Sequence, residues 1–282
     1  MGFHEKPNVF IRDVTLNVSD LEQSLLFYTD FLGFKLLEKT ETTAALTADG
    51  ATPLIKLAVP EQAAPKQPGT TGLYHFAILL PSRESLGEFL LYLAKRQFRL
   101  GAADHLVSEA LYFSDPDGNG IEVYCDRPAE QWKWSGEQVA MATDPLDADG
   151  VLAAAHDKEW LGMPADTVIG HIHLHVSDLE LTGRFYREVI GYEVVCAYGG
   201  QALFLSTGKY HHHVAINTWN GRGAEKPAAN SVGLKEYAID LPDEAYKEQV
   251  IEALRKWRMP YCEEDGVLRT SDTSGNKIAM YI

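Results

Sequence analysis

An internal repeat is the feature that most constrains how this 282-residue chain can fold. Residues 14–33 (VTLNVSDLEQSLLFYTDFLG) match residues 172–191 (IHLHVSDLELTGRFYREVIG). Residues 72–81 (GLYHFAILLP) match 233–242 (GLKEYAIDLP), and 114–124 (SDPDGNGIEVY) match 271–281 (SDTSGNKIAMY). The repeat predicts a tandem duplication, with one domain in residues 1–127, a connector in 128–164 and a second domain in 165–282.

Each half is itself predicted to hold two similar modules. A module begins with a short alternating strand, such as residues 14–18, and continues with a helix and three further strands. Ser19 or Asp20 can cap the first helix, and Ser82 can cap a helix whose apolar face holds Leu86, Phe89, Leu90 and Leu93. The predicted fold is therefore α+β, with four βαβββ modules paired into two half-barrels whose concave faces can each hold a ligand.

Composition excludes several classes of function. Aspartate and glutamate number 40 against 25 lysines and arginines, so the net charge of −15 disfavours nucleic acid and anionic membranes as partners. No apolar stretch reaches the length of a membrane span, and the first residues lack an apolar signal core. Three widely spaced cysteines fit neither a disulfide framework nor a zinc cluster. A cytoplasmic location is expected.

The module openings and endings resemble a known superfamily. VSDLEQSLLFYTDFLGF and DPDGNGIEVY are similar to the corresponding segments of vicinal oxygen chelate proteins, which include glyoxalase I, bleomycin-resistance proteins and extradiol dioxygenases. The chain resembles in particular the two-domain catechol-2,3-dioxygenase-like proteins of bacilli, over nearly its whole length. This resemblance implies the same half-barrel fold and a metal site on a concave face.

The resemblance also implies where metal ligands stand, on the first and last strands of the modules. The first-strand positions hold Asp13, His75, His171 and Glu236, and the last-strand positions hold Glu122 and Ala279. The usual set from modules three and four would be His171, Glu236 and Ala279. That set lacks one histidine and the carboxylate, so the C-terminal site is expected to be lost.

Two other ligand sets remain open. If modules one and two pair, the ligands are Asp13, His75 and Glu122; if modules two and three pair, they are His75, Glu122 and His171. We favour the second set, because two histidines and one carboxylate are typical of non-haem Fe(II) oxygenases. Fe(II) is the expected cofactor, with Mn(II) as the alternative. Each histidine could instead be a hydrogen-bonded core residue, and His171 shares its strand face with two others.

Further residues take catalytic roles by the same resemblance. Tyr112 stands ten residues before Glu122, and His105 seven residues before Tyr112; both are expected to orient the substrate. An acid–base histidine is expected on the last strand of module three, where the chain has His211-His212-His213. Strand alternation puts His211 and His213 on one face. His213 aligns best with the family base, and His211 is the second candidate.

The implied reaction is extradiol cleavage of a catechol with O2, giving a 2-hydroxymuconic-semialdehyde-type product. Three ligands on one face of the metal leave adjacent positions for the catechol oxygens and for dioxygen. Phe76, Tyr124 and Trp219 are candidate pocket walls. The partners expected are thus a catecholic substrate and O2, with self-association left open. The alternatives are another metal-dependent enzyme of the scaffold, such as an isomerase or a thiol-conjugating enzyme, and a non-catalytic protein that binds a small aromatic compound.

Overall fold

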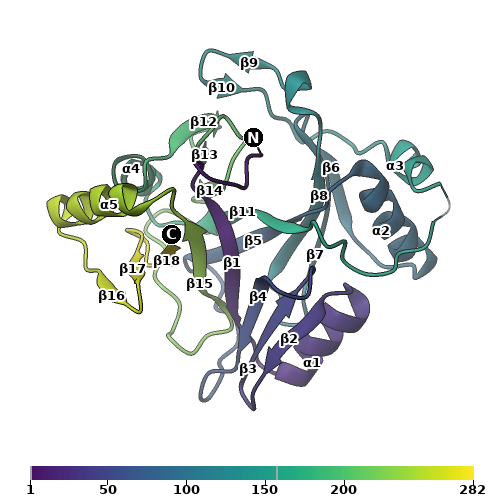
Figure 1. Cartoon of the computed structure of the whole chain (residues 1–282), viewed down its shortest axis with the longest axis horizontal. Coiled ribbons are helices and arrows are strands. Elements are labelled where there is room, and N and C mark those ends of the chain that lie inside the picture. The colour runs from purple at the N-terminus through teal and green to yellow at the C-terminus, as the bar shows by residue number, and fades with distance from the viewer. Residues whose placement is uncertain (1, 157) are drawn as a thin grey trace.

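The computed structural model describes residues 2–156 and 158–282 and shows an α+β fold (Figure 1). The order of strand, helix and three strands occurs four times along the chain, which confirms the four predicted modules. Their strands form two eight-stranded curled sheets, and a two-stranded ribbon pairs with neither of them. No helix in the described part of the chain is long and apolar enough to cross a membrane.

The first sheet, here called the β1 sheet, combines the first and fourth modules. Its central strands β1 and β15 run antiparallel and join the two modules edge to edge. From one edge to the other, its strands are β16 (Cys262–Glu264), β17 (Val267–Ser271), β18 (Lys277–Tyr281), β15 (Gly233–Asp240), β1 (Phe10–Asn17), β4 (Pro53–Ala58), β3 (Thr43–Thr47) and β2 (Lys35–Lys39).

The second sheet, here called the β5 sheet, combines the second and third modules through an antiparallel pair, β11 and β5. In order across the sheet, its strands are β12 (Glu193–Tyr198), β13 (Ala202–Ser206), β14 (Val214–Asn217), β11 (Val168–His175), β5 (Gly72–Leu79), β8 (Gly120–Asp126), β7 (Ser108–Ser114) and β6 (Gly101–Asp104). Each half of the repeat therefore contributes one module to each sheet. The domain boundaries at 127 and 165 stay a prediction.

The described residues form five α-helices, and an aspartate or serine side chain caps each of them at its N-terminus. The helices are α1 (Leu21–Leu26), α2 (Arg83–Lys95), α3 (Ala148–Ala154), α4 (Leu179–Phe185) and α5 (Glu244–Trp257). Asp20 accepts a hydrogen bond from the Gln23 backbone, and Ser82 accepts one from Ser85, so the predicted caps form. The predicted apolar face of α2 is buried.

Alternation along the central strands separates the core from the site. In β11, Ile172 and Leu174 belong to the large apolar core, which also receives residues of the β1 sheet and of the helices. His171 and His173 alternate with them and therefore point to the opposite face of the β5 sheet. Phe76 of β5 lies in the core as well, so it does not form a pocket wall.

The connector between the repeats is structured. It contains a short 3₁₀ turn (Ala129–Gln131), strands β9 (Trp134–Ser135) and β10 (Gln138–Val139), and helix α3. Asp144 pairs with Asp104 at the end of β6, so the connector runs along the edge of the β5 sheet (Figure 1). This course brings residues 141–143 into the lining of the cavity described next.

Candidate metal centre

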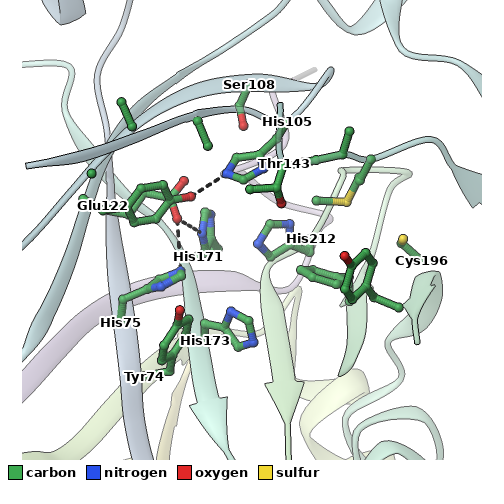
Figure 2. A pocket seen from close by; sticks show the side chains of 18 of the residues that line it. Tyr74, His75, His105, Ser108, Glu122, Thr143, His171, His173, Cys196 and His212 are labelled. Carbon is green, nitrogen blue, oxygen red and sulfur yellow. Dashed lines mark hydrogen bonds and ion pairs between the residues drawn. The ribbon is translucent and has the colours of Figure 1, made fainter. Parts of the chain in front are cut away.

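His75, Glu122 and His171 come together on the face of the β5 sheet opposite the core (Figure 2). Their ligand atoms lie within 4.8 Å of one another, and all three side chains are buried. His75 Nε2 is 3.0 Å from Glu122 Oε2, and His171 Nε2 is 3.1 Å from the same oxygen. Within the described residues, no other group of histidines, cysteines and carboxylates has this spacing.

Strand register explains why these three residues meet. His171 on β11 stands opposite Ala77 on β5, and Ala77 stands beside Glu122 on β8. The small alanine between them leaves room for the carboxylate and the imidazole to approach one another. His75 lies two residues before Ala77 and shares its face. This geometry exists because modules two and three pair, which is the pairing that the favoured ligand set requires.

The electrostatics of the cluster suit a cation. Burial lowers the pKa of His171 to about 4, so its imidazole is neutral near pH 7. Burial alone would raise the pKa of Glu122, but the neighbouring His171 and His75 outweigh it and hold that pKa well below its usual range. The set thus combines the neutral imidazole of His171 with an ionised carboxylate, the states that metal ligands need.

The donor atoms also fit a metal. His75 Nε2 is a buried atom without a hydrogen-bond partner of good geometry among residues 2–156 and 158–282, although it faces the carboxylate. A buried polar atom without a partner is costly. Two histidine nitrogens and one carboxylate oxygen converging on one point are the donor set of non-haem Fe(II) sites.

The cluster forms the floor of a cavity of about 340 Å³. Tyr112 and His105 both line it, as the sequence predicts, and Tyr112 Oη is 2.5 Å from His105 Nε2. His105 Nδ1 lies 2.6 Å from the Ala142 carbonyl oxygen, which can only accept. The proton of neutral His105 is therefore on Nδ1, and Tyr112 donates to Nε2. Burial raises the pKa of Tyr112 well above its ordinary value, so the hydroxyl stays protonated.

The histidine triplet is arranged differently from the expectation. His212 lines the cavity, whereas His211 and His213 do not. His213 Nε2 is 3.0 Å from the Phe3 carbonyl oxygen, and His211 Nε2 is 2.8 Å from Asp126 Oδ1. The expectation of His213 in the pocket fails because the three residues precede β14, which begins at Val214. Strand alternation does not apply to a bend.

The cavity also contains residues that the sequence did not indicate, and a residue expected in its wall lies elsewhere. His173 lines it, but its Nε2 accepts a hydrogen bond from Asn217 at 2.9 Å, which occupies that nitrogen. Trp219 lines the cavity as expected, while Tyr124 is buried beneath His171, at a ring distance of 4.9 Å. The connector residues Met141, Ala142 and Thr143 also line it, and no motif in the sequence pointed to them.

The corresponding position on the β1 sheet carries ion pairs instead of a ligand set. Asp13 Oδ2 is 2.9 Å from Lys56 Nζ, and Glu236 Oε2 is 3.6 Å from Arg269 Nε. Ala279 stands across Ala238 from Asp13, where the β5 sheet has Glu122. Asp13 therefore belongs to the other sheet and does not join His75, so the alternative ligand set is not assembled.

Gly170, next to His171, is required by close packing. A Cβ at this position would overlap the Tyr124 hydroxyl and lie 2.7 Å from Tyr124 Cζ. We expect Gly170→Ala to lower the free energy of unfolding by about 1–3 kcal/mol through overpacking, measured by denaturant unfolding. Gly101→Ala is the control, because its Cβ would meet Tyr112 Cβ at an ordinary 3.5 Å. Equal stability of the two variants would contradict this account.

Comparison with known proteins agrees with the fold. The sequence pattern of the Glyoxalase/Bleomycin resistance protein/Dioxygenase superfamily matches residues 11–123. The catechol-2,3-dioxygenase of Bacillus subtilis (strain 168) is 43% identical over 271 residues, which are 95% of this chain and 95% of that protein.

Solved structures show the same fold at low sequence identity. A candidate dioxygenase of Bacillus subtilis aligns over 98% of this chain and 86% of its own, with a TM-score of 0.66 and 14% identity. Glyoxalase I of Zea mays aligns over 96% of this chain and 92% of its own, with a TM-score of 0.59 and 16% identity.

These comparisons define the class of protein. The chain belongs to the glyoxalase/bleomycin resistance protein/dioxygenase superfamily. Within that superfamily it is a catechol-2,3-dioxygenase-like enzyme, on the strength of the identity that extends over nearly its whole length.

Proposed function

We propose that the protein is a non-haem Fe(II) extradiol dioxygenase that cleaves catechol, or a catechol with an apolar substituent, to a 2-hydroxymuconic-semialdehyde-type product. The observation that carries this proposal is the buried set of His75, Glu122 and His171 at the floor of the cavity. These three residues would hold the iron. Bound there, Fe(II) would supply adjacent positions that bind the catechol oxygens and activate dioxygen.

His212 is the proposed general base of this reaction. Its ring lines the cavity, and its pKa lies well below the ordinary value because the side chain is buried and has His171 and other histidines as neighbours. A neutral imidazole can accept the proton of a catechol hydroxyl that comes within hydrogen-bond distance. Ring centroids of His212 and His171 are 4.0 Å apart, so a substrate next to the ligand set also meets His212.

Tyr112 and His105 are the residues proposed to orient the substrate on the other side of the cavity. Tyr112 stands beside Glu122 across β7 and β8, which places its hydroxyl near the ligand set. Its proton points to His105 Nε2, so its oxygen is free to accept a hydrogen bond from the substrate. The pair can thus orient the substrate through this hydrogen bond.

The cavity lining favours an uncharged substrate. No lysine or arginine lines it, and Glu122 is its one acidic residue within the described chain. Met141, Phe204 and Trp219 supply apolar and aromatic surface instead. An anionic substituent would therefore be buried without a partner, which is strongly unfavourable.

This lining predicts the order of substrates. We expect kcat/KM for catechol and 4-methylcatechol to exceed that for protocatechuate by about 100-fold or more, because an unpaired buried carboxylate costs several kcal/mol. The methyl ester of protocatechuate has similar size without the charge and is expected to recover much of the difference. The series is measured by initial rates of O2 uptake. Equal values for the acid and its ester would contradict the assignment.

The proposed reaction is tested with metal-free protein. Anaerobic loading with Fe(II), followed by catechol and air, is expected to give about one iron per chain, in line with a single ligand set, together with a yellow product and equimolar O2 consumption. Stoichiometric iron without O2 uptake would overturn the dioxygenase proposal. O2-independent turnover of a glutathione hemithioacetal would instead indicate an isomerase.

A further inference from the structure

A chain of hydrogen bonds leads from His212 away from the cavity. His212 Nδ1 is 2.8 Å from His211 Nδ1, and His211 Nε2 is 2.8 Å from Asp126 Oδ1. His211 is fully buried and His212 is 5% exposed, so water does not replace the contact between these two rings. Figure 2 shows the His212 ring projecting among the cavity residues. His212 therefore has one ring nitrogen in the chain and the other available to the cavity.

The direction of these hydrogen bonds follows from Asp126. An ionised carboxylate only accepts, so His211 must donate from Nε2. A neutral His211 then has a lone pair on Nδ1 and accepts from His212. This requires the proton of neutral His212 to be on Nδ1, which leaves a lone pair on Nε2. A base needs that lone pair, because the other tautomer would present an N–H to the substrate.

We propose that Asp126 and His211 are positioning residues that hold His212 in the Nδ1–H tautomer, with the basic nitrogen Nε2 available to the cavity. The inference rests on the proposed role of His212 as the base. In the reaction, the catechol O–H bond breaks and an N–H bond forms at His212 Nε2. The positive charge then develops on the His212 ring. Two hydrogen bonds connect this ring to the Asp126 carboxylate, and the negative charge of the carboxylate stabilises it electrostatically.

Neighbouring residues support this arrangement of Asp126 and His211. Tyr210 donates to the same Asp126 oxygen at 3.3 Å, and Tyr124 and Tyr210 hydroxyls are 2.6 Å apart. Ring contacts with Tyr210 and Trp132, at centroid distances of 4.1 and 5.2 Å, enclose His211 in aromatic surface. The rings of His211 and His171 are 6.0 Å apart.

The competing arrangement is a His211 imidazolium paired with Asp126. It would make His211 donate to His212 Nδ1 and would put the His212 proton on Nε2. That state places a positive charge on a fully buried ring among other histidines, with one carboxylate as partner. In the neutral chain, each of the two hydrogen bonds also has one donor and one acceptor. The two arrangements differ in the ring nitrogen of His212 that carries the proton, which can be measured directly.

The first test is the tautomer itself. In metal-free protein with ¹⁵N-labelled histidine, two-bond ¹H–¹⁵N spectra near pH 7 distinguish protonated from unprotonated ring nitrogens. His212 is expected to show protonated Nδ1 and unprotonated Nε2. A His212 with its proton on Nε2 would overturn the proposal. Because this readout needs no substrate, it stands or falls separately from the proposed reaction.

The second test uses Asp126→Asn in the iron-loaded enzyme. The asparagine amide can donate to His211 Nε2, which reverses both hydrogen bonds and puts the His212 proton on Nε2. We expect kcat to fall by about 100-fold or more, as for other catalytic histidines held in the wrong tautomer, with KM and iron content unchanged. Asp240→Asn is the matched control, because this strand-end aspartate pairs with Arg12 on the β1 sheet.

A double variant separates the relay from general damage to the fold. His211→Gln interrupts the same chain, so Asp126→Asn combined with His211→Gln should lose no more kcat than the more damaging single variant. Multiplying losses would contradict a single chain of hydrogen bonds. If Asp126→Asn proves too unstable to assay, the tautomer of His212 is measured in His211→Gln instead. Retention of the Nδ1–H form of His212 in that variant would show that the hydrogen-bond chain does not set the tautomer.

Discussion

Glu122→Gln is expected to abolish iron binding together with ring cleavage. The carboxylate oxygen Oε2 lies 3.0 and 3.1 Å from the two histidine nitrogens, so it completes the donor set and carries its negative charge. The amide keeps the shape and removes the charge. Loss of a residue that only orients a metal ligand lowers metal affinity by up to about 100-fold. We expect the loss of the ligand itself to lower the affinity by more than that. Metal analysis after dialysis and O2 uptake with catechol measure both effects.

Glu236→Gln is the matched control for this variant. Glu236 occupies the position on β15 that His75 occupies on β5 in the repeat, and it lies near Arg269 instead of a ligand set. It is expected to leave iron content and kcat unchanged. Full iron in Glu122→Gln, or loss of iron in Glu236→Gln, would show that the ligand set has been assigned to the wrong sheet.

His212→Ala is expected to have the second largest effect, on kcat. The loss of a general base typically costs between about 100-fold and 10,000-fold in rate, and His212 is the member of the triplet that lines the cavity. Iron content should remain, because His212 is not in the ligand set. Single-turnover measurements with iron-loaded protein and catechol separate this chemical loss from weaker substrate binding.

His213→Ala distinguishes the structural assignment from the sequence-based one. His213 bonds to the Phe3 carbonyl oxygen and packs beside Tyr210, so its loss should lower the free energy of unfolding by about 1–3 kcal/mol while kcat persists. A large fall in kcat for His213→Ala, with His212→Ala still active, would support His213 as the base, as the sequence predicts. It would contradict the proposal that His212 is the base.

Local patterns carried much of the prediction. The repeat identified four modules, and the alternation in strand β11 put its histidines on one face and Ile172 and Leu174 on the other. The spacing of His105, Tyr112 and Glu122 depends only on two adjacent strands, β7 and β8, and the residues just before them. Such short-range relations survive in any arrangement of the modules, because strand periodicity determines them.

The tertiary structure was needed for the relations between distant segments. The connector crosses the edge of the β5 sheet and brings Ala142 to His105 through a contact that no local pattern predicts. The histidine triplet forms a bend that packs against the N-terminal segment and Asp126, so alternation could not assign its members. These outcomes depend on packing between residues that are far apart in sequence.

The sequence by itself determined that this protein consists of four βαβββ modules with filled ligand positions in the second module and a lost carboxylate in the fourth. The repeat and the strand periodicity indicate the modules, and the resemblance to the superfamily implies the ligand positions. Only the tertiary structure decided that β5 pairs with β11, so that His171 joins His75 and Glu122 while Asp13 turns to Lys56 on the other sheet. The modules share one strand pattern, and either pairing satisfies it locally; burial across the whole core selects between them.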